Sequence, residues 1–152
     1  IPIRNIKEKQ TYYGVLNLLD RDFVPMPSEN GDGENTVSFI KRLQGLNPEK
    51  KLLIIWDGAR YHDCGEVRTY LDEVNRGLEE KDWKITFLLF APNAPDQNPV
   101  EDVWLRAKNH LRKHFYENKT FQQAKSCFSN FISKQIFNFS KIDWYLTIPQ
   151  SE

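Results

Sequence analysis

The 152 residues suffice for one folded domain with a hydrophobic core, since domains of this size bury roughly 70% of the surface that their unfolded chains expose. Hydrophobic residues make up 39% and charged residues 28%, which excludes the composition of a disordered chain. The 21 basic and 21 acidic residues cancel, so net charge gives no sign of nucleic-acid binding. Basic residues nevertheless gather after residue 104, either as a solvated helical face or as a DNA-contacting surface: Arg106, Lys108, Arg112, Lys113, Lys119 and Lys125.

Cysteine content and hydropathy indicate in which cellular compartment the protein is expected. Cys64 and Cys127 are too few for a disulfide framework, so we interpret them as ordinary thiols in a reducing environment. The longest apolar runs, 52–56 and 85–91, are far shorter than the ~20 residues that a membrane-spanning helix needs. We therefore expect a cytoplasmic protein without a membrane partner. The first residue is Ile rather than Met, which suggests a piece of a longer protein.

The chain is predicted to open with a β-hairpin. Residues 11–19 are rich in aromatic and aliphatic side chains, and residues 23–26 form a second short apolar run after a turn at 20–22. A helix that ends before Pro48 should follow, because the apolar residues before it recur at helical spacing: Val37, Ile40 and Leu43.

The middle of the chain predicts a strand, a helix and a strand. Residues 52–56 and 85–90 are continuous apolar runs of strand length, typical of strands covered on both faces. Between them, Asp63 and Glu66 resemble a capping box that opens a helix ending near Gly77. This order predicts a right-handed parallel crossover, so the sheet that includes the hairpin should be mixed.

The last third predicts two helices and a strand. Asn98 and Pro99 suit the N-cap and first position of one helix, and Thr120 and Gln123 form a capping box for the next. Residues 142–148 have strand composition. With no internal repeat and no long linker, we predict a single domain over residues 1–152. Apolar residues mark the buried faces of the two helices: Val100, Val103, Trp104, Ala107 and Leu111, then Phe121, Ala124, Phe128, Phe131 and Ile132.

Two carboxylates stand where α/β folds place ligand sites. Asp57 directly follows the strand 52–56 and so should lie at the C-terminal edge of the sheet, either as a ligand or as a cap of the next turn. Glu101 stands at the third helical position after Asn98. It either completes a capping box with Asn98 or turns toward the sheet edge beside Trp104.

Residues 56–62, WDGARYH, and residues 90–104, FAPNAPDQNPVEDVW, resemble the paired signatures of mariner-superfamily DDE transposases, especially the bacterial insertion-sequence branch. The family pattern is an Asp-Asn-Ala-x-x-His segment after a strand, then an Asn-Pro-x-Glu-x-x-Trp segment that opens a helix. A lysine follows about one turn later, here Lys108. The resemblance extends from about Tyr12 to Phe131.

The resemblance implies an α/β ribonuclease-H-like fold, a mixed sheet with flanking helices, in which three carboxylates hold two Mg²⁺ or Mn²⁺ ions. It makes Asp57 the second and Glu101 the third of these catalytic, metal-binding residues. Two such cations ~4 Å apart activate a water or a DNA 3′-hydroxyl and stabilise the leaving oxygen. Other candidates surround them: Asn98 and His62 in supporting positions, although His62 alternatively only caps or packs, and Arg60, Lys108 and Arg112 on DNA phosphates.

Three departures from the family pattern limit this resemblance. The first family Asp lies on the strand before the hairpin, and the acidic residue upstream of Thr11 is Glu8, in a charged context. Gly58 replaces the usual Asn, and the interval between the two carboxylates is several residues longer than is common. We therefore expect a domain truncated at its N-terminus, without its first, central strand and inactive alone.

The resemblance implies an enzyme that cleaves and rejoins DNA at transposon ends, near the bacterial nucleoid, with a homodimer as one expected form. The alternative is a non-catalytic, decayed or domesticated fragment that only binds DNA or protein. A third reading, an unrelated nuclease of ribonuclease-H fold, is disfavoured by the Asn-Pro-Val-Glu segment. In the implied fold the missing strand lies between the hairpin and strand 52–56, and we predict that 142–148, from this chain or a second copy, pairs there.

Overall fold

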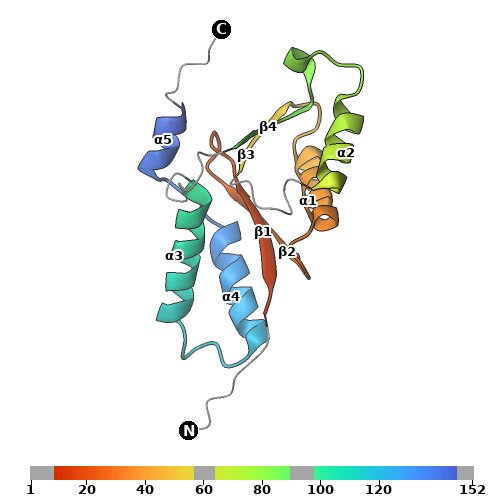
Figure 1. The fold of residues 1–152 in the computed structure, drawn as a ribbon. Helices are drawn as coiled ribbons and strands as arrows, with labels where there is room; N and C mark the ends of the chain where they lie inside the picture. The colour runs from red at the N-terminus through yellow and green to blue at the C-terminus, as the bar shows by residue number, and fades with distance from the viewer. Residues whose placement is uncertain (1–8, 57–63, 90–97, 147–152) are drawn as a thin grey trace. The chain divides into compact units, whose positions relative to one another are not determined.

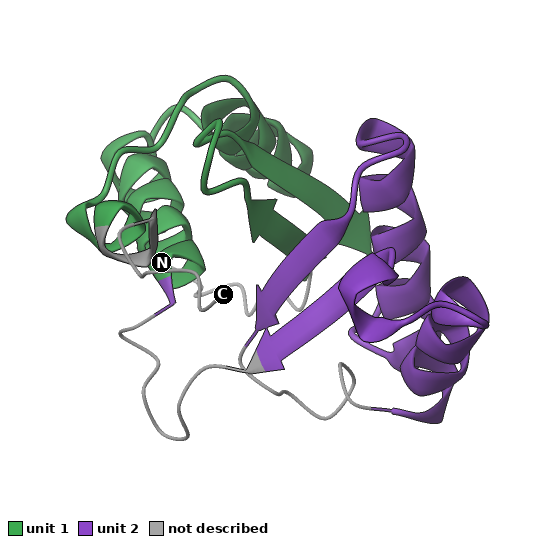
Figure 2. Cartoon of the chain, turned by 90° about the horizontal axis from the view of Figure 1, so that it is seen from above, with its two compact units in different colours: residues 1–29, 99–152 green, residues 30–98 purple. Residues whose placement is uncertain are grey.

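The computed structural model describes residues 9–56, 64–89 and 98–146, and its contacts divide the chain into two compact units (Figures 1 and 2). Unit 1 comprises residues 1–29 and 99–152, and unit 2 comprises residues 30–98. Unit 1 contains β1 (Thr11–Leu16), β2 (Phe23–Ser28), α3 (Pro99–Lys113), α4 (Phe121–Ser133) and α5 (Ser140–Leu146). Unit 2 contains α1 (Gly33–Leu46), β3 (Leu52–Trp56), α2 (Gly65–Asn75), a 3-10 turn (Glu80–Asp82) and β4 (Ile85–Leu89).

The predicted hairpin is confirmed in unit 1. Strands β1 and β2 pair antiparallel, with Thr11 opposite Ser28 and Leu16 opposite Phe23. The turn between them is organised by Asn17, whose side-chain oxygen accepts hydrogen bonds from the backbone N–H groups of the two residues that follow Leu18, at 2.9 and 3.1 Å. This side-chain bonding adds to the backbone bonds of the turn, in which the Asn17 N–H donates to the Asp22 carbonyl at 2.9 Å and the Arg21 N–H to the Asn17 carbonyl at 2.7 Å.

Helices α3 and α4 pack beside the hairpin and share one core with it. Val103 and Ala107 on α3 and Ile132 on α4 are fully buried, which confirms the apolar stripes predicted from spacing. The predicted capping box at Thr120 is also confirmed, because the Gln123 N–H donates to the threonine hydroxyl at 3.1 Å and the Gln123 side chain accepts from the Thr120 N–H at 3.2 Å. Periodicity and end signals therefore located both helices.

The prediction of a strand at 142–148 is wrong for the described part of that segment, which is helix α5. Ile142 is fully buried, while Lys141 forms an ion pair at 2.8 Å with a carboxylate on α3 and Asp143 one at 2.6 Å with a guanidinium of the hairpin turn. A strand would project Lys141 and Asp143 from one face, whereas a helix separates successive side chains by about 100°. The helix lets each residue reach its own partner.

Unit 2 contains the predicted crossover. Strands β3 and β4 pair parallel, Leu52 opposite Ile85, and α2 lies between them in sequence. Its core joins Ile40 of α1, Val67 of α2 and Ile85 of β4. The N-cap of α2 is Cys64 rather than the predicted Asp63, which lies outside the described residues.

The two sheets belong to different units. Each unit contains one two-stranded sheet in its described residues, the antiparallel hairpin in unit 1 and the parallel pair in unit 2, so the single mixed sheet stays a prediction. Contrary to the prediction, strand β3 is not covered on both faces, since Leu53 is 60% exposed and Leu88 on β4 is 49% exposed. Because α5 is helical over 140–146, that segment does not supply the strand predicted between the two sheets. The predicted absence of a central strand and the single domain stay predictions.

Candidate active site

The first turn of α3 carries the predicted acidic site. The helix begins at Pro99, as predicted, and half-buried Asn98 directly precedes it. Both Glu101 and Asp102 lie in this first turn, where the positive end of the helix dipole stabilises carboxylates. Asp102 accepts a hydrogen bond from Lys141 Nζ at 2.8 Å, so this carboxylate is engaged in holding α5.

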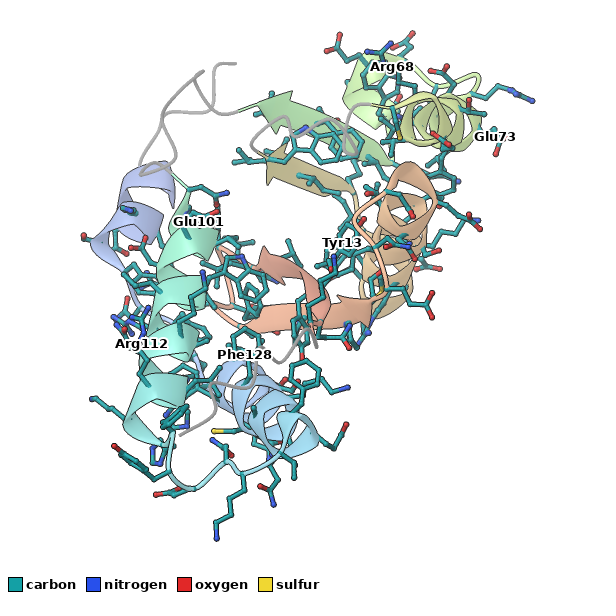
Figure 3. The ribbon with its side chains drawn as sticks, turned by 60° about the horizontal axis from the view of Figure 1, so that its bottom comes forward. Tyr13, Arg68, Glu73, Glu101, Arg112 and Phe128 are labelled. Atoms are coloured by element: carbon teal, nitrogen blue, oxygen red, sulfur yellow. The ribbon has the colours of Figure 1, made fainter. Side chains whose placement is uncertain are left out.

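Glu101 lies on the exposed face of α3. Val103 and Ala107 have no exposed surface and define the buried face, and Glu101 lies roughly 120–160° around the helix from them, at about 100° per residue. Figure 3 shows its side chain near the N-terminal end of the helix, with Arg112 towards the other end. The Glu101 carboxylate is thus accessible to a ligand.

Two predicted phosphate contacts share this face of α3. Lys108 and Arg112 follow Glu101 by seven and eleven residues, which at helical geometry places all three within about 40° of one another. Both cations are exposed, and the Arg112 guanidinium donates to Asn109 Oδ1 at 2.9 Å, which restrains it. The structure therefore aligns one candidate metal ligand and two candidate phosphate contacts along about 16 Å of one helix.

Three other predicted site residues, Asp57, Arg60 and His62, lie outside the described residues. Asp57 comes directly after Trp56, the last residue of β3, at the C-terminal end of a parallel strand. Asp57 belongs to unit 2 and Glu101 to unit 1. Their approach to one another stays a prediction, as does the supporting role of Asn98 and His62.

The donor chemistry of Glu101 suits a hard divalent cation, because Mg²⁺ and Mn²⁺ prefer carboxylate oxygens and Mg²⁺ keeps several of its waters. Within the part of the chain that the structure describes, no group of three or more His, Cys, Asp or Glu residues could hold a metal ion. Of the two first-turn carboxylates, Asp102 is committed to Lys141 and Glu101 is accessible. Glu101 is therefore the candidate metal ligand on this helix, and its participation in a metal site stays a prediction.

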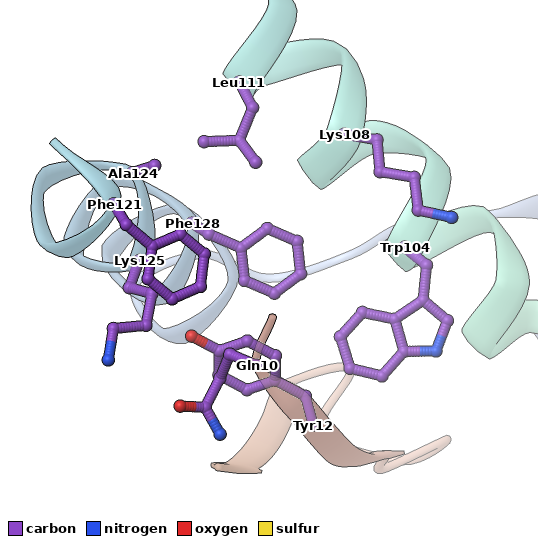
Figure 4. Close-up of a pocket in the computed structure, with 9 residues that line it drawn as sticks. All are labelled: Gln10, Tyr12, Trp104, Lys108, Leu111, Phe121, Ala124, Lys125 and Phe128. Carbon is purple, nitrogen blue, oxygen red and sulfur yellow. The ribbon is translucent and has the colours of Figure 1, made fainter. Parts of the chain in front are cut away.

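Reasoning from the sequence missed a pocket on the neighbouring side of α3 (Figure 4). Trp104, Lys108 and Leu111 line it at spacings of four and three residues, which place them along one side of the helix. The sequence predicted Trp104 and Leu111 on the buried face and Lys108 as a phosphate contact, and it could not show that Gln10 and Tyr12, before and in β1, lie opposite them. The full lining is Gln10, Tyr12, Trp104, Lys108, Leu111, Phe121, Ala124, Lys125 and Phe128.

Among the described residues, no helix has the length and apolar character needed to span a membrane. A carboxylate in the first turn of a helix, followed on the same face by two cations, has the chemistry to bind a divalent cation and the phosphates of a nucleic-acid strand. A family model described as DDE superfamily endonuclease matches residues 3–122. The chain thus belongs to the DDE superfamily endonucleases, a family of nucleases that act on DNA. Membership in this family implies a ribonuclease-H-like fold, and its members typically use divalent metals. No curated protein matches the sequence.

Proposed function

We propose that this chain is the catalytic domain of a DNA transposase of the mariner superfamily, from the bacterial insertion-sequence branch, that cleaves transposon ends and joins them to target DNA. The observation that supports this best is the common face of α3 that carries Glu101, Lys108 and Arg112. The family match includes all three residues and both motif segments.

In this proposal each residue acts on one part of the substrate. Glu101 and Asp57 hold the cations, and Lys108 and Arg112 bind phosphates beyond the scissile bond, which fixes the register of the strand without recognising its sequence. Bound Mg²⁺ or Mn²⁺ supplies activation of the attacking oxygen and stabilisation of the leaving one. Asn98 and His62 support the carboxylates, and Arg60 binds a further phosphate.

In the family pattern the first carboxylate lies on the strand before the hairpin, and Asp57 and Glu101 match the second and third, so we propose that the first comes from that strand. Two carboxylates are few for a cation that dehydrates reluctantly, and this chain should bind divalent metals weakly. Mn²⁺ titrated into the full chain should give little heat below millimolar concentration. Glu101→Gln and Asp57→Asn should each remove the heat that is observed, because each deletes a charged ligand.

The matched control is Glu73→Gln, which makes the same chemical change on the exposed surface of α2, a different element from the proposed site (Figure 3). It should leave the Mn²⁺ titration unchanged. Tight binding that survives the Glu101 and Asp57 substitutions would place the site elsewhere.

Activity is tested with a longer protein that includes the preceding strand. Nicking of supercoiled plasmid in Mn²⁺ should be lost in Glu101→Gln and retained in Glu73→Gln. Nicking that persists without the Glu101 carboxylate would refute the catalytic assignment. A longer protein that binds DNA but never nicks it would support the non-catalytic alternative instead.

A further inference from the structure

The pocket described above lies entirely within unit 1, between the start of β1, α3 and α4. It has a volume of about 380 Å³, within the range of about 300–1,000 Å³ typical of small-molecule sites. Figure 4 shows rings from three different elements around it, Tyr12 from β1, Trp104 from α3 and Phe128 from α4. The pocket is therefore a product of the tertiary fold, not of one helix.

Its aromatic walls are held in place by their neighbours. The rings of Tyr12 and Phe128 have centroids 5.0 Å apart, and those of Trp104 and Phe128 are stacked at 5.9 Å with 8° between their planes. The Tyr12 hydroxyl lies 3.3 Å from Ser129 Oγ, and the Trp104 ring packs edge-on against Phe23 at 5.0 Å. Fixed rings offer a flat apolar group a surface to stack on at low entropic cost.

The charged side chains around the pocket determine which kind of apolar group it can bind. Lys108 lies on the α3 side of the pocket and Lys125 on the α4 side, its Nζ 5.3 Å from the centroid of the Phe121 ring. The stretch 104–125 contains six basic residues and a single acidic one, Glu117. This surface favours an occupant that is both flat and apolar at its centre and anionic at its ends, which is the chemistry of a nucleotide within a strand.

We propose that this pocket binds one unpaired base of a DNA strand, with Lys108 and Lys125 on the phosphates that flank it. This rests on the proposed function, because it extends the contact with the same substrate. Glu101 precedes Lys108 by seven residues, or about 10 Å along the helix.

Single-stranded DNA binding tests this, measured in EDTA so that neither metal binding nor cleavage contributes. The full chain is titrated into two fluorescently labelled strands of equal charge and about 12 nucleotides, oligothymidylate and a strand of abasic sites. Stacking is worth about 1–3 kcal/mol per base, so the thymidine strand should bind about 5- to 150-fold more tightly. Phe121→Ala should remove most of this difference.

The two cations are tested by Lys108→Ala and Lys125→Ala, which should weaken binding of both strands because they remove phosphate contacts. Lys134→Ala is the matched control, since Lys134 is exposed at the C-cap of α4, about 13 Å along the helix from Lys125. It should bind like the wild type. If Phe121→Ala fails to fold, the wild-type preference for thymidine over abasic DNA still tests base binding, and Lys108→Ala, at an exposed position, still tests where the strand binds.

Several outcomes would overturn the proposal. Equal affinity for the thymidine and abasic strands would mean that the surface binds phosphates alone, and binding of neither strand would mean that it does not bind DNA. A dimer in light scattering that dissociates on Phe121→Ala would show a second copy of the chain in the pocket. Base-dependent binding without any metal-dependent cleavage in the longer protein would support the pocket and refute the proposed function, so the two can fail separately.

Discussion

Replacing Gly14 with alanine should disturb the contact on which the position of α3 depends. A Cβ at this position of β1 would lie 2.7 Å from Trp104 Cζ2, and closer still to Phe23 Cζ. Real side chains do not approach a Cβ this closely, so one of the rings or the strand must move. Trp104 lies between Glu101 and Lys108 on α3, and its displacement would reach the candidate site and the pocket.

The magnitude follows from the packing. One methyl group in a well-packed core typically costs about 1–3 kcal/mol, and here it meets two rings that already pack edge to face at 5.0 Å. We expect a loss of about 2–3 kcal/mol in the free energy of unfolding. For a chain of this length, each kcal/mol lowers Tm by about 2–4 °C, so thermal unfolding followed by circular dichroism should show a decrease of about 4–12 °C.

Gly45 provides the matched control. It lies inside α1, where nothing lies within 4 Å of an added Cβ, so Gly45→Ala should stabilise the protein by about 0.5–1 kcal/mol. Adding Phe23→Leu to Gly14→Ala should restore part of the lost Tm, because leucine has no atom at the Cζ position. If Gly14→Ala unfolds within 1–2 °C of the wild type, roughly the effect of half a kcal/mol, then β1 and α3 do not pack as described.

Three further predictions concern unit 1. Thr120→Ala removes the capping box of α4 and should cost about 0.5–2 kcal/mol in urea denaturation, and an unchanged midpoint would mean that the helix start does not limit stability. Ile142→Ala should cost about 2–5 kcal/mol, because the side chain is fully buried, and a cost below 1 kcal/mol would indicate that α5 is not docked. Burial, with His114 and Lys113 nearby, lowers the pKa of His110 in the folded protein. As the pH drops below about 6.5, the His110 side chain is therefore protonated more readily in the unfolded chain than in the folded one, and the free energy of unfolding should fall. Tm measured between pH 7.5 and 5.5 should fall less in His110→Gln than in the wild type, and an equal fall in both would refute this origin.

Local signals in the sequence located most elements. Helices α3 and α4 were predicted because their apolar residues recur at helical spacing and because Pro99 and Thr120 mark their starts. The parallel pair was predicted because two apolar runs flank a helix, a pattern that leaves few topologies. These features depend on residues close together in the chain, which is why a single sequence reveals them.

The predictions failed where contacts between residues far apart in the sequence determine the local structure. Residues 142–146 have the composition of a strand, but their conformation follows from partners on α3 and in the hairpin turn, far away in sequence. Strand propensity is weak enough for such contacts to override it. The pocket was missed for the same reason, because Tyr12 and Phe128 are 116 residues apart and meet only in the folded unit.

The candidate site was predicted in part. Glu101, Lys108 and Arg112 came from a motif and a cluster of charge, and their common face follows from helical geometry alone. Whether that face of α3 is exposed depends on which other residues of the helix pack into the hydrophobic core. Asp102 shows the difference, since it neighbours Glu101 in sequence, yet it pairs with Lys141 and helps to hold α5.

The buried side of α3 therefore determines what its other sides can do. Val103 and Ala107 have no exposed surface, and a rotation of the helix by one residue, about 100°, would place a charged side chain in their position. Burying an unpaired charge costs several kcal/mol, so the helix has one stable rotation about its axis. That rotation leaves Glu101 and Lys108 on the solvent side and turns Trp104 and Leu111 towards the pocket. The same apolar contacts that stabilise unit 1 thus align the candidate metal ligand Glu101, the candidate phosphate contact Lys108 and the aromatic Trp104 along one helix.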